Sequence, residues 1–273
     1  MIHSVFFSLF THFATGLLFV SLFISLEELG KLYFRVTSGV AFALIFLAML
    51  SQPFGSIAFT ELFSFNAESD FAQKVTYLSF YACLAVIAAY NVFLPRFHRP
   101  LLILMFSFGL MGVVFFALAN APTASAASVT TWMVAANGVS SALILGSVLA
   151  AMITGHWYLV QHNLSLNPLK KSTLLYVLAV IIRGLFLISV IILSGRAIQF
   201  SDVFAGLDFR SYVFIGRVVI GLLIPFVFGV MTWNAAKIRS TQSATGILYA
   251  TVVLVLIGET FASFLYLMTG IPL

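Results

Sequence analysis

The sequence predicts an all-α integral membrane protein with eight transmembrane helices. Composition, the length of its apolar runs and the distribution of positive charge support this fold class. Of the 273 residues, 62% are hydrophobic and only 8% are charged, whereas roughly 25% of residues are charged in an average globular domain. A water-soluble domain of this length exposes more surface than so few polar residues can cover. Lipid is therefore the predicted solvent.

Eight apolar runs are long enough to cross a hydrocarbon core of roughly 30 Å, which needs about 20 helical residues. The predicted spans are residues 5–26, 36–53, 76–94, 101–119, 130–160, 172–194, 211–232 and 243–269. The chain is thus expected to reside in a lipid bilayer as a multi-pass protein.

Positive charges predict how the chain is oriented. The loops after spans 1, 3, 5 and 7 carry Lys31, Arg35, Arg96, Arg99, Lys170, Lys171, Lys237 and Arg239. The opposite loops carry Lys74, Arg196 and Arg210. Short loops rich in Lys and Arg stay in the cytoplasm. We therefore expect a protein of the inner (cytoplasmic) membrane with both termini outside.

Loop lengths repeat in the same order in the two halves of the chain. Thr15-Gly16 is followed fifteen residues later by Lys31, and Thr154-Gly155 is followed by Lys170 at the same spacing. This pattern predicts two four-helix units of parallel topology, residues 1–120 and 121–273, of a kind found in several membrane folds. The alternative is coincidence, because short matches between apolar helices are common.

Three charged residues fall within the predicted spans, namely Arg183, Arg217 and Glu259. A charge in hydrocarbon costs several kcal/mol, so such a residue indicates a functional site or a buried partner. A rise of about 1.5 Å per residue places the backbones of Arg217 and Glu259 at similar depths in the outer half of the membrane. It places Arg183 near the midplane of the membrane. A buried Arg217–Glu259 pair with Arg183 close by is predicted.

Polar residues near Glu259 extend this prediction. Ser263 and Tyr266 lie one and two turns further along the same helix face. On the preceding span, Gly221 and Pro225 follow Arg217, and proline is expected to kink the helix. Two readings remain open: an ion-pair clamp that binds nothing, or a net positive pocket for an anionic or carbonyl-bearing ligand.

Two histidines are candidate ligand-binding residues. His12 lies in the outer half of span 1 with Ser8 and Gly16 at steps of four, so it is expected to face the bundle. It could exchange a proton, bond a quinone oxygen or ligate haem iron, or be a core histidine with satisfied hydrogen bonds. His156 lies near the inner end of span 5, where it is either an interfacial residue or a haem ligand. Quinone and haem are the candidate cofactors.

Several function classes have no support in the sequence. No basic, aromatic-rich patch predicts nucleic-acid binding, and no Gly-rich phosphate loop predicts ATP hydrolysis. Cys83 is the single cysteine, which excludes an intramolecular disulfide and a Cys-based metal site. The segment Asn137-Gly138-Val139-Ser140-Ser141 resembles the serine motif of rhomboid proteases, but His162 is expected outside the membrane. Catalysis by this chain alone is not expected.

Eight spans, outward termini and an outer histidine in the first helix resemble, in architecture alone, the quinol-binding anchor subunits of molybdopterin oxidoreductases. Three hypotheses follow. The first is a membrane subunit of a multi-protein electron-transfer or respiratory complex that contacts quinone or haem and binds other membrane subunits. The second is a secondary transporter for a small organic anion, and the third is a structural or assembly protein.

Overall fold

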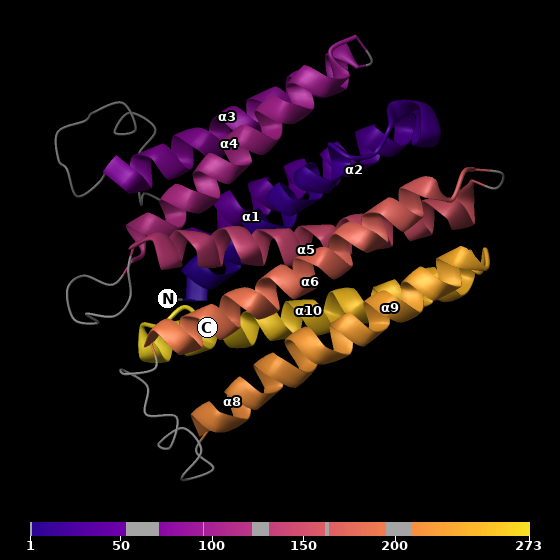
Figure 1. Cartoon of the computed structure of the whole chain (residues 1–273). Helices are drawn as coiled ribbons and strands as arrows, with labels where there is room; N and C mark the ends of the chain where they lie inside the picture. The colour runs from indigo at the N-terminus through magenta and orange to yellow at the C-terminus, as the bar shows by residue number, and fades with distance from the viewer. Residues whose placement is uncertain (1, 53–70, 95, 122–130, 162–163, 195–208) are drawn as a thin grey trace.

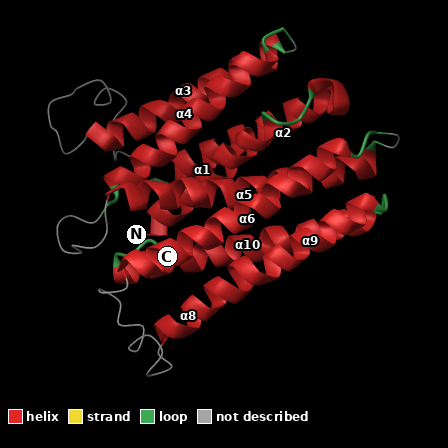
Figure 2. Cartoon of the chain, in the orientation of Figure 1, coloured by secondary structure: helices red, strands yellow, loops and turns green. Residues whose placement is uncertain are grey.

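The computed structural model describes residues 2–52, 71–94, 96–121, 131–161, 164–194 and 209–273. Within these residues, every regular element is helical (Figure 2). Eight helices are long and apolar enough to cross a membrane, so the predicted fold class is confirmed. Their order is α1 (Ile2–Ser21), α2 (Leu26–Ser51), α3 (Phe71–Phe93), α4 (His98–Ala119), α5 (Thr131–Val160), α6 (Asn167–Ser194), α8 (Phe209–Val218) continued by η3 (Val219–Leu223) and α9 (Ile224–Lys237), and α10 (Thr241–Thr269).

Helix α2 begins ten residues before the predicted span. The Ser25 side chain caps it by accepting a hydrogen bond from the Glu27 amide, and its first turn breaks at Gly30, whose φ of 79° suits glycine. Lys31 and Arg35 therefore lie on the helix, and the prediction that they belong to a loop was wrong. Lys74 likewise lies buried in the first turn of α3. Helices extend beyond the apolar run because their backbone hydrogen bonds do not depend on apolar side chains.

The seventh transmembrane segment consists of α8, η3 and α9, and it is irregular at its centre. Residues 219–223 form a π-helical turn immediately before Pro225. Proline has no N–H to donate, so a helix must adjust around it, and π-bulges inside helices often lie at functional sites. The Tyr176 hydroxyl of α6 donates a hydrogen bond to the Pro225 carbonyl. This bond holds α6 against the irregular turn.

Helix α5 is the central and most buried helix, and it packs against α1, α4, α6 and α10 (Figure 1). The contact between α1 and α5 is close because glycines meet there. A Cβ atom on Gly146 would lie 2.1 Å from the Gly16 carbonyl carbon, so neither position has room for a side chain. Small residues at such crossings allow membrane helices to approach through their backbones.

The two halves of the chain pack in a similar order, since α1 contacts α2 and α4 while α5 contacts α6 and α10. Division into the units 1–120 and 121–273 stays a prediction. Both chain termini lie at the same end of the bundle (Figure 1), which we call the terminal end. The predicted topology assigns the terminal end to the outer side of the membrane, and this assignment also stays a prediction.

Candidate ligand-binding site

Three buried charges from three helices meet in the terminal half of the bundle. Glu259 of α10 receives two hydrogen bonds from Arg183 of α6, from Nε to Oε1 at 3.1 Å and from Nη2 to Oε2 at 2.8 Å. Arg217 of α8 places Nη2 at 2.9 Å from Glu259 Oε1. The exposed fractions of Arg183, Arg217 and Glu259 are 1%, 0% and 2%. The expected Arg217–Glu259 contact is thus present, with Arg183 as a second partner.

Helix packing brings these charges together. Gly221 and Gly258 meet where the seventh segment crosses α10, and a Cβ atom on Gly258 would lie 2.2 Å from the Gly221 Cα. Glu259 is the next residue on α10, so this crossing places its carboxylate within reach of Arg217. At a rise of about 1.5 Å per residue, the backbones of Arg183, Arg217 and Glu259 lie about 12 to 16 Å from the terminal ends of α6, α8 and α10.

The two arginines are held differently. The Nη1 atom of Arg183 also donates to Asn137 Oδ1 at 2.7 Å, to Asn137 O at 3.3 Å and to Ser140 Oγ at 2.8 Å. Arg217 lies close to Glu259, but the angle does not suit a hydrogen bond, and its side-chain nitrogens have no hydrogen-bond partner among the described residues. Arg183 therefore positions the carboxylate through fixed hydrogen bonds, whereas Arg217 contributes mainly its charge.

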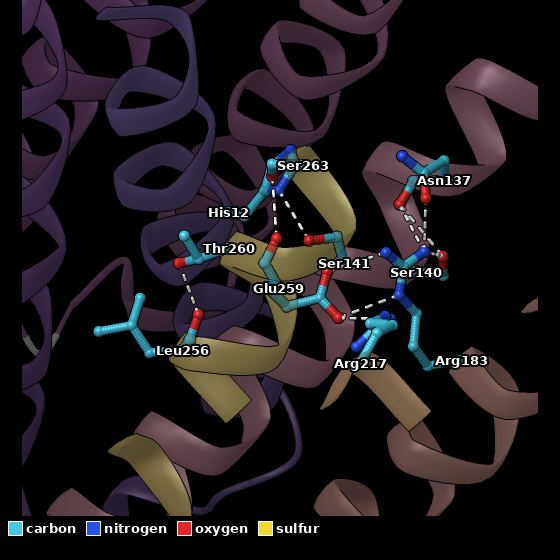
Figure 3. A network of polar contacts seen from close by, with 10 residues as sticks. All are labelled: His12, Asn137, Ser140, Ser141, Arg183, Arg217, Leu256, Glu259, Thr260 and Ser263. Atoms are coloured by element: carbon cyan, nitrogen blue, oxygen red, sulfur yellow. Dashed lines mark hydrogen bonds and ion pairs between the residues drawn. The ribbon is translucent and has the colours of Figure 1, made fainter. Parts of the chain in front are cut away.

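A second polar chain reaches Glu259 from α1. His12 Nδ1 lies 3.0 Å from Ser141 Oγ of α5. Figure 3 shows Ser141 close to both His12 and Glu259. Five helices, α1, α5, α6, α8 and α10, therefore contribute residues to one polar cluster. With two arginines and one glutamate, its net charge is +1 when His12 is neutral.

A cavity of about 360 Å³ opens from this network toward the terminal end. His12, Ser141, Arg183 and Glu259 are its deepest polar residues. The whole lining consists of Ser4, Val5, Ser8, His12, Phe116, Ala117, Asn120, Val134, Asn137, Gly138, Ser141, Arg183, Glu259, Ala262, Ser263, Tyr266 and Leu267. The cavity therefore has largely apolar walls and a polar floor, in which Arg183 and Glu259 balance each other and the excess positive charge comes from Arg217 behind Glu259.

Most of the candidate residues from the sequence lie at this cavity. Ser263 and Tyr266 line it beside Glu259, and the Tyr266 hydroxyl donates to the Asn120 carbonyl at 3.2 Å near the mouth. Arg217 and His156 do not line the cavity, and Arg217 lies behind Glu259. Ser263 uses its hydroxyl within α10, donating to the Glu259 carbonyl at 2.9 Å (Figure 3).

The structure does not bring the two candidate haem ligands together. His12 contacts Ser141, whereas His156 lies fifteen residues further along α5, about 22 Å away along the helix axis. His156 instead contacts the Tyr249 hydroxyl at 2.8 Å. One haem iron therefore cannot be ligated by both. Among the described residues, no group of three or more His, Cys, Asp or Glu side chains is arranged to hold a metal ion.

Sequence reasoning missed three residues of the network, Asn137, Ser140 and Ser141. All three lie on α5 and their spacing of three and four residues places them on one helix face. This cluster of polar residues within a long apolar span was the available signal. The segment resembles a protease motif, whereas in the structure Asn137 and Ser140 accept hydrogen bonds from Arg183, and Ser141 contacts His12.

Comparisons with protein-family models, with curated proteins and with solved structures gave no match to this chain.

Proposed function

We propose that the chain is a membrane subunit of a multi-protein electron-transfer complex and that its cavity binds the head group of a quinone-type ligand. The observation that carries this proposal is the combination of apolar walls with a hydrogen-bonding, net positive floor inside a membrane-spanning bundle. A quinone head has the matching character, since an apolar ring carries two polar oxygens on opposite edges.

The size of the cavity supports a ligand of one or two rings. Its volume of about 360 Å³ is at the low end of small-molecule pockets, which are roughly 300 to 1,000 Å³. Val5, Phe116, Val134 and Leu267 supply apolar surface for the ring. The excess positive charge of the floor favours electron-rich oxygens over a cationic group.

The role of a subunit follows from the chemistry that such a ligand requires. A quinone exchanges electrons with a redox centre. In the proposed complex, a partner protein supplies the redox centre, and this chain binds and orients the ligand in the bilayer.

One observation favours a second candidate, a secondary transporter for a small organic anion. The cavity is lined by α1 and α4 from the first predicted unit and by α5, α6 and α10 from the second. Transporters built from repeats place their substrate at the interface between them, and the floor carries an excess positive charge. The third candidate, a structural protein, corresponds to an ion-pair clamp with no ligand.

Binding of a short-chain ubiquinone analogue to the purified protein in lipid nanodiscs tests the proposal. We expect saturable binding that weakens about tenfold in His12→Leu, because a lost hydrogen bond of about 1.4 kcal/mol corresponds to that factor. His156→Leu is the matched control, since that histidine lies outside the cavity, and its affinity should be unchanged. Co-purification with a redox-active partner should accompany binding.

Other outcomes select the alternatives. Binding and vesicle uptake of a small carboxylate, without binding of the quinone analogue, would favour transport. Binding of neither probe, with a protein that is stable and has no partners, would favour the structural role.

A further inference from the structure

Asn137 of α5 has one side-chain group that the polar cluster does not use. Its side-chain oxygen Oδ1 accepts a hydrogen bond of 2.7 Å from Nη1 of Arg183, and its backbone carbonyl accepts from the same atom at 3.3 Å (Figure 3). The side-chain amide nitrogen, Nδ2, has no hydrogen-bond partner among the described residues. Asn137 therefore keeps two unused N–H donors.

The orientation of this amide is fixed by Arg183. A guanidinium has only donors, so the amide atom that faces it must be the oxygen. Arg183 is itself held by two hydrogen bonds to Glu259 and by one to Ser140 Oγ. The amide cannot turn over without placing its own donors against those of Arg183. Nδ2 therefore faces away from Arg183 in a fixed direction.

The cavity is the space onto which Nδ2 opens. Asn137 is half-buried and lines the cavity. Among the described residues, the side-chain nitrogens that are enclosed by protein without a partner belong to Trp157 and Arg217. Nδ2 is not one of them, so it keeps accessible surface beside the cavity. A ligand that contacts it must offer an acceptor.

Asn137 and His12 lie about one helix turn apart along the cavity. His12 contacts Ser141 Oγ, and Ser141 follows Asn137 by four residues, a rise of about 6 Å along α5. The two oxygens of a quinone lie on opposite edges of its ring. A ring bound between these residues can therefore use one oxygen at His12 and the other at Asn137.

We propose that Asn137 is a specificity-determining residue of the site, which donates a hydrogen bond to a carbonyl oxygen of the ligand and favours it over a hydroxyl group. This inference rests on the proposed quinone-type ligand and adds the residue that selects its oxidised form. A carbonyl oxygen only accepts, which matches the N–H donors of Nδ2. A hydroxyl group also has a proton to donate, and the Asn137 oxygen is turned toward Arg183. A buried hydroxyl proton without an acceptor is costly.

Exchanging the donor for an acceptor tests the inference on the full-length protein in nanodiscs. Asn137→Asp keeps an oxygen for Arg183 and replaces Nδ2 by a second oxygen, which only accepts hydrogen bonds when the carboxylate is ionised. The probes are the short-chain ubiquinone analogue and its hydroquinone, kept reduced in anaerobic buffer. We expect the ratio of quinone affinity to hydroquinone affinity to fall by about tenfold or more, because the quinone loses one hydrogen bond and the hydroquinone gains one. The contribution of His12 to this ratio is the same in both proteins and cancels.

Asn91→Asp is the matched control. Asn91 is a half-buried asparagine of α3 whose amide nitrogen donates to the Ile87 carbonyl at 2.9 Å, and it lies outside the cavity. This variant brings the same change of charge into a spanning helix. Its affinity ratio should stay within about twofold of that of the unmodified protein.

Infrared spectra of the bound quinone analogue give a second measurement, which needs no substitution at Asn137. A hydrogen bond lowers the stretching frequency of a carbonyl group. In His12→Leu, the bond from His12 is absent, and a carbonyl band should still lie below its position in lipid alone because Asn137 still donates. Carbonyl bands at the lipid position would overturn the inference, even if the Asn137→Asp protein did not fold.

The outcomes separate this inference from the proposed function. An unchanged or raised ratio in a folded Asn137→Asp protein, or an equal loss of both affinities, would overturn selection by Asn137 and leave it as a support for Arg183. Quinone binding that weakens about tenfold in His12→Leu would in that case keep the quinone-type site in place. Binding of neither probe to the unmodified protein would overturn both.

Discussion

Replacing the two buried arginines one at a time should affect stability unequally, although both contact Glu259. Arg183 gives the carboxylate two hydrogen bonds, whereas Arg217 makes one close charge contact without hydrogen-bond geometry. Arg183→Met and Arg217→Met remove a positive charge from equally buried positions. A difference between these variants therefore reports on geometry and not on burial.

The magnitudes follow from what each variant leaves behind. In Arg183→Met, the carboxylate loses both hydrogen bonds and keeps only the contact with Arg217, so a loss of about 3–5 kcal/mol is expected. In Arg217→Met, Glu259 keeps Arg183, and a guanidinium with no hydrogen-bond partner among the described residues is removed from the interior. Each unsatisfied buried donor costs about 1–3 kcal/mol. The net change should therefore stay within about 1 kcal/mol.

Unfolding in mixed micelles with increasing denaturing detergent, followed by loss of helical circular dichroism, measures this difference. Arg210→Met is the control, because Arg210 is an exposed arginine in the first turn of α8 and should change the free energy of unfolding by less than about 0.5 kcal/mol. If Arg217→Met destabilised the protein as much as Arg183→Met, the assignment of Arg183 as the main partner of Glu259 would be wrong.

Two further predictions concern topology and helix packing. Cysteines introduced at Ser69 and Ser240 should react with a membrane-impermeant reagent from opposite sides of intact cells, Ser69 from outside, and labelling of both from one side would contradict the orientation. Gly146→Ala should destabilise the bundle by several kcal/mol, because its Cβ atom would overlap the Gly16 backbone, whereas Gly184→Ala, with no atom within 4 Å of its Cβ, should not. Equal unfolding midpoints for the two alanine variants would show that α1 and α5 can separate without cost.

The sequence was sufficient for the number and approximate position of the helices because length and apolarity are properties of single segments. It was less reliable at their ends. Lys31 and Arg35 lie on α2 and are exposed, since long side chains can reach water from a helix end. Lys74 lies on α3 and is buried. A charge at the end of an apolar run therefore does not mark the end of the helix.

The depth of the candidate site in the membrane could be predicted from the sequence, but the contacts within the site could not. Counting residues along each span placed Arg217 and Glu259 at similar depth, which required no knowledge of packing. The partner role of Arg183 depends on how α6 is rotated and how closely it approaches α10, and the sequence specifies neither. For the same reason, the polarity of Asn137 and Ser141 was visible, whereas their bonds to Arg183 and His12 depend on packing between helices.

The floor of the cavity also distinguishes the binding and transport hypotheses in physical terms. His12 and Ser141 are the deepest residues of α1 and α5 in the cavity, and the next turn inward brings Gly16 and Gly146 into backbone contact. A solute crossing the membrane between α1 and α5 would have to separate this backbone contact in every cycle. Further along α5, Thr154 also contacts Tyr33 of α2 through their hydroxyls at 2.8 Å. A ligand that enters and leaves from the terminal end does not require α1 and α5 to separate, which favours a binding site that is closed on its inner side.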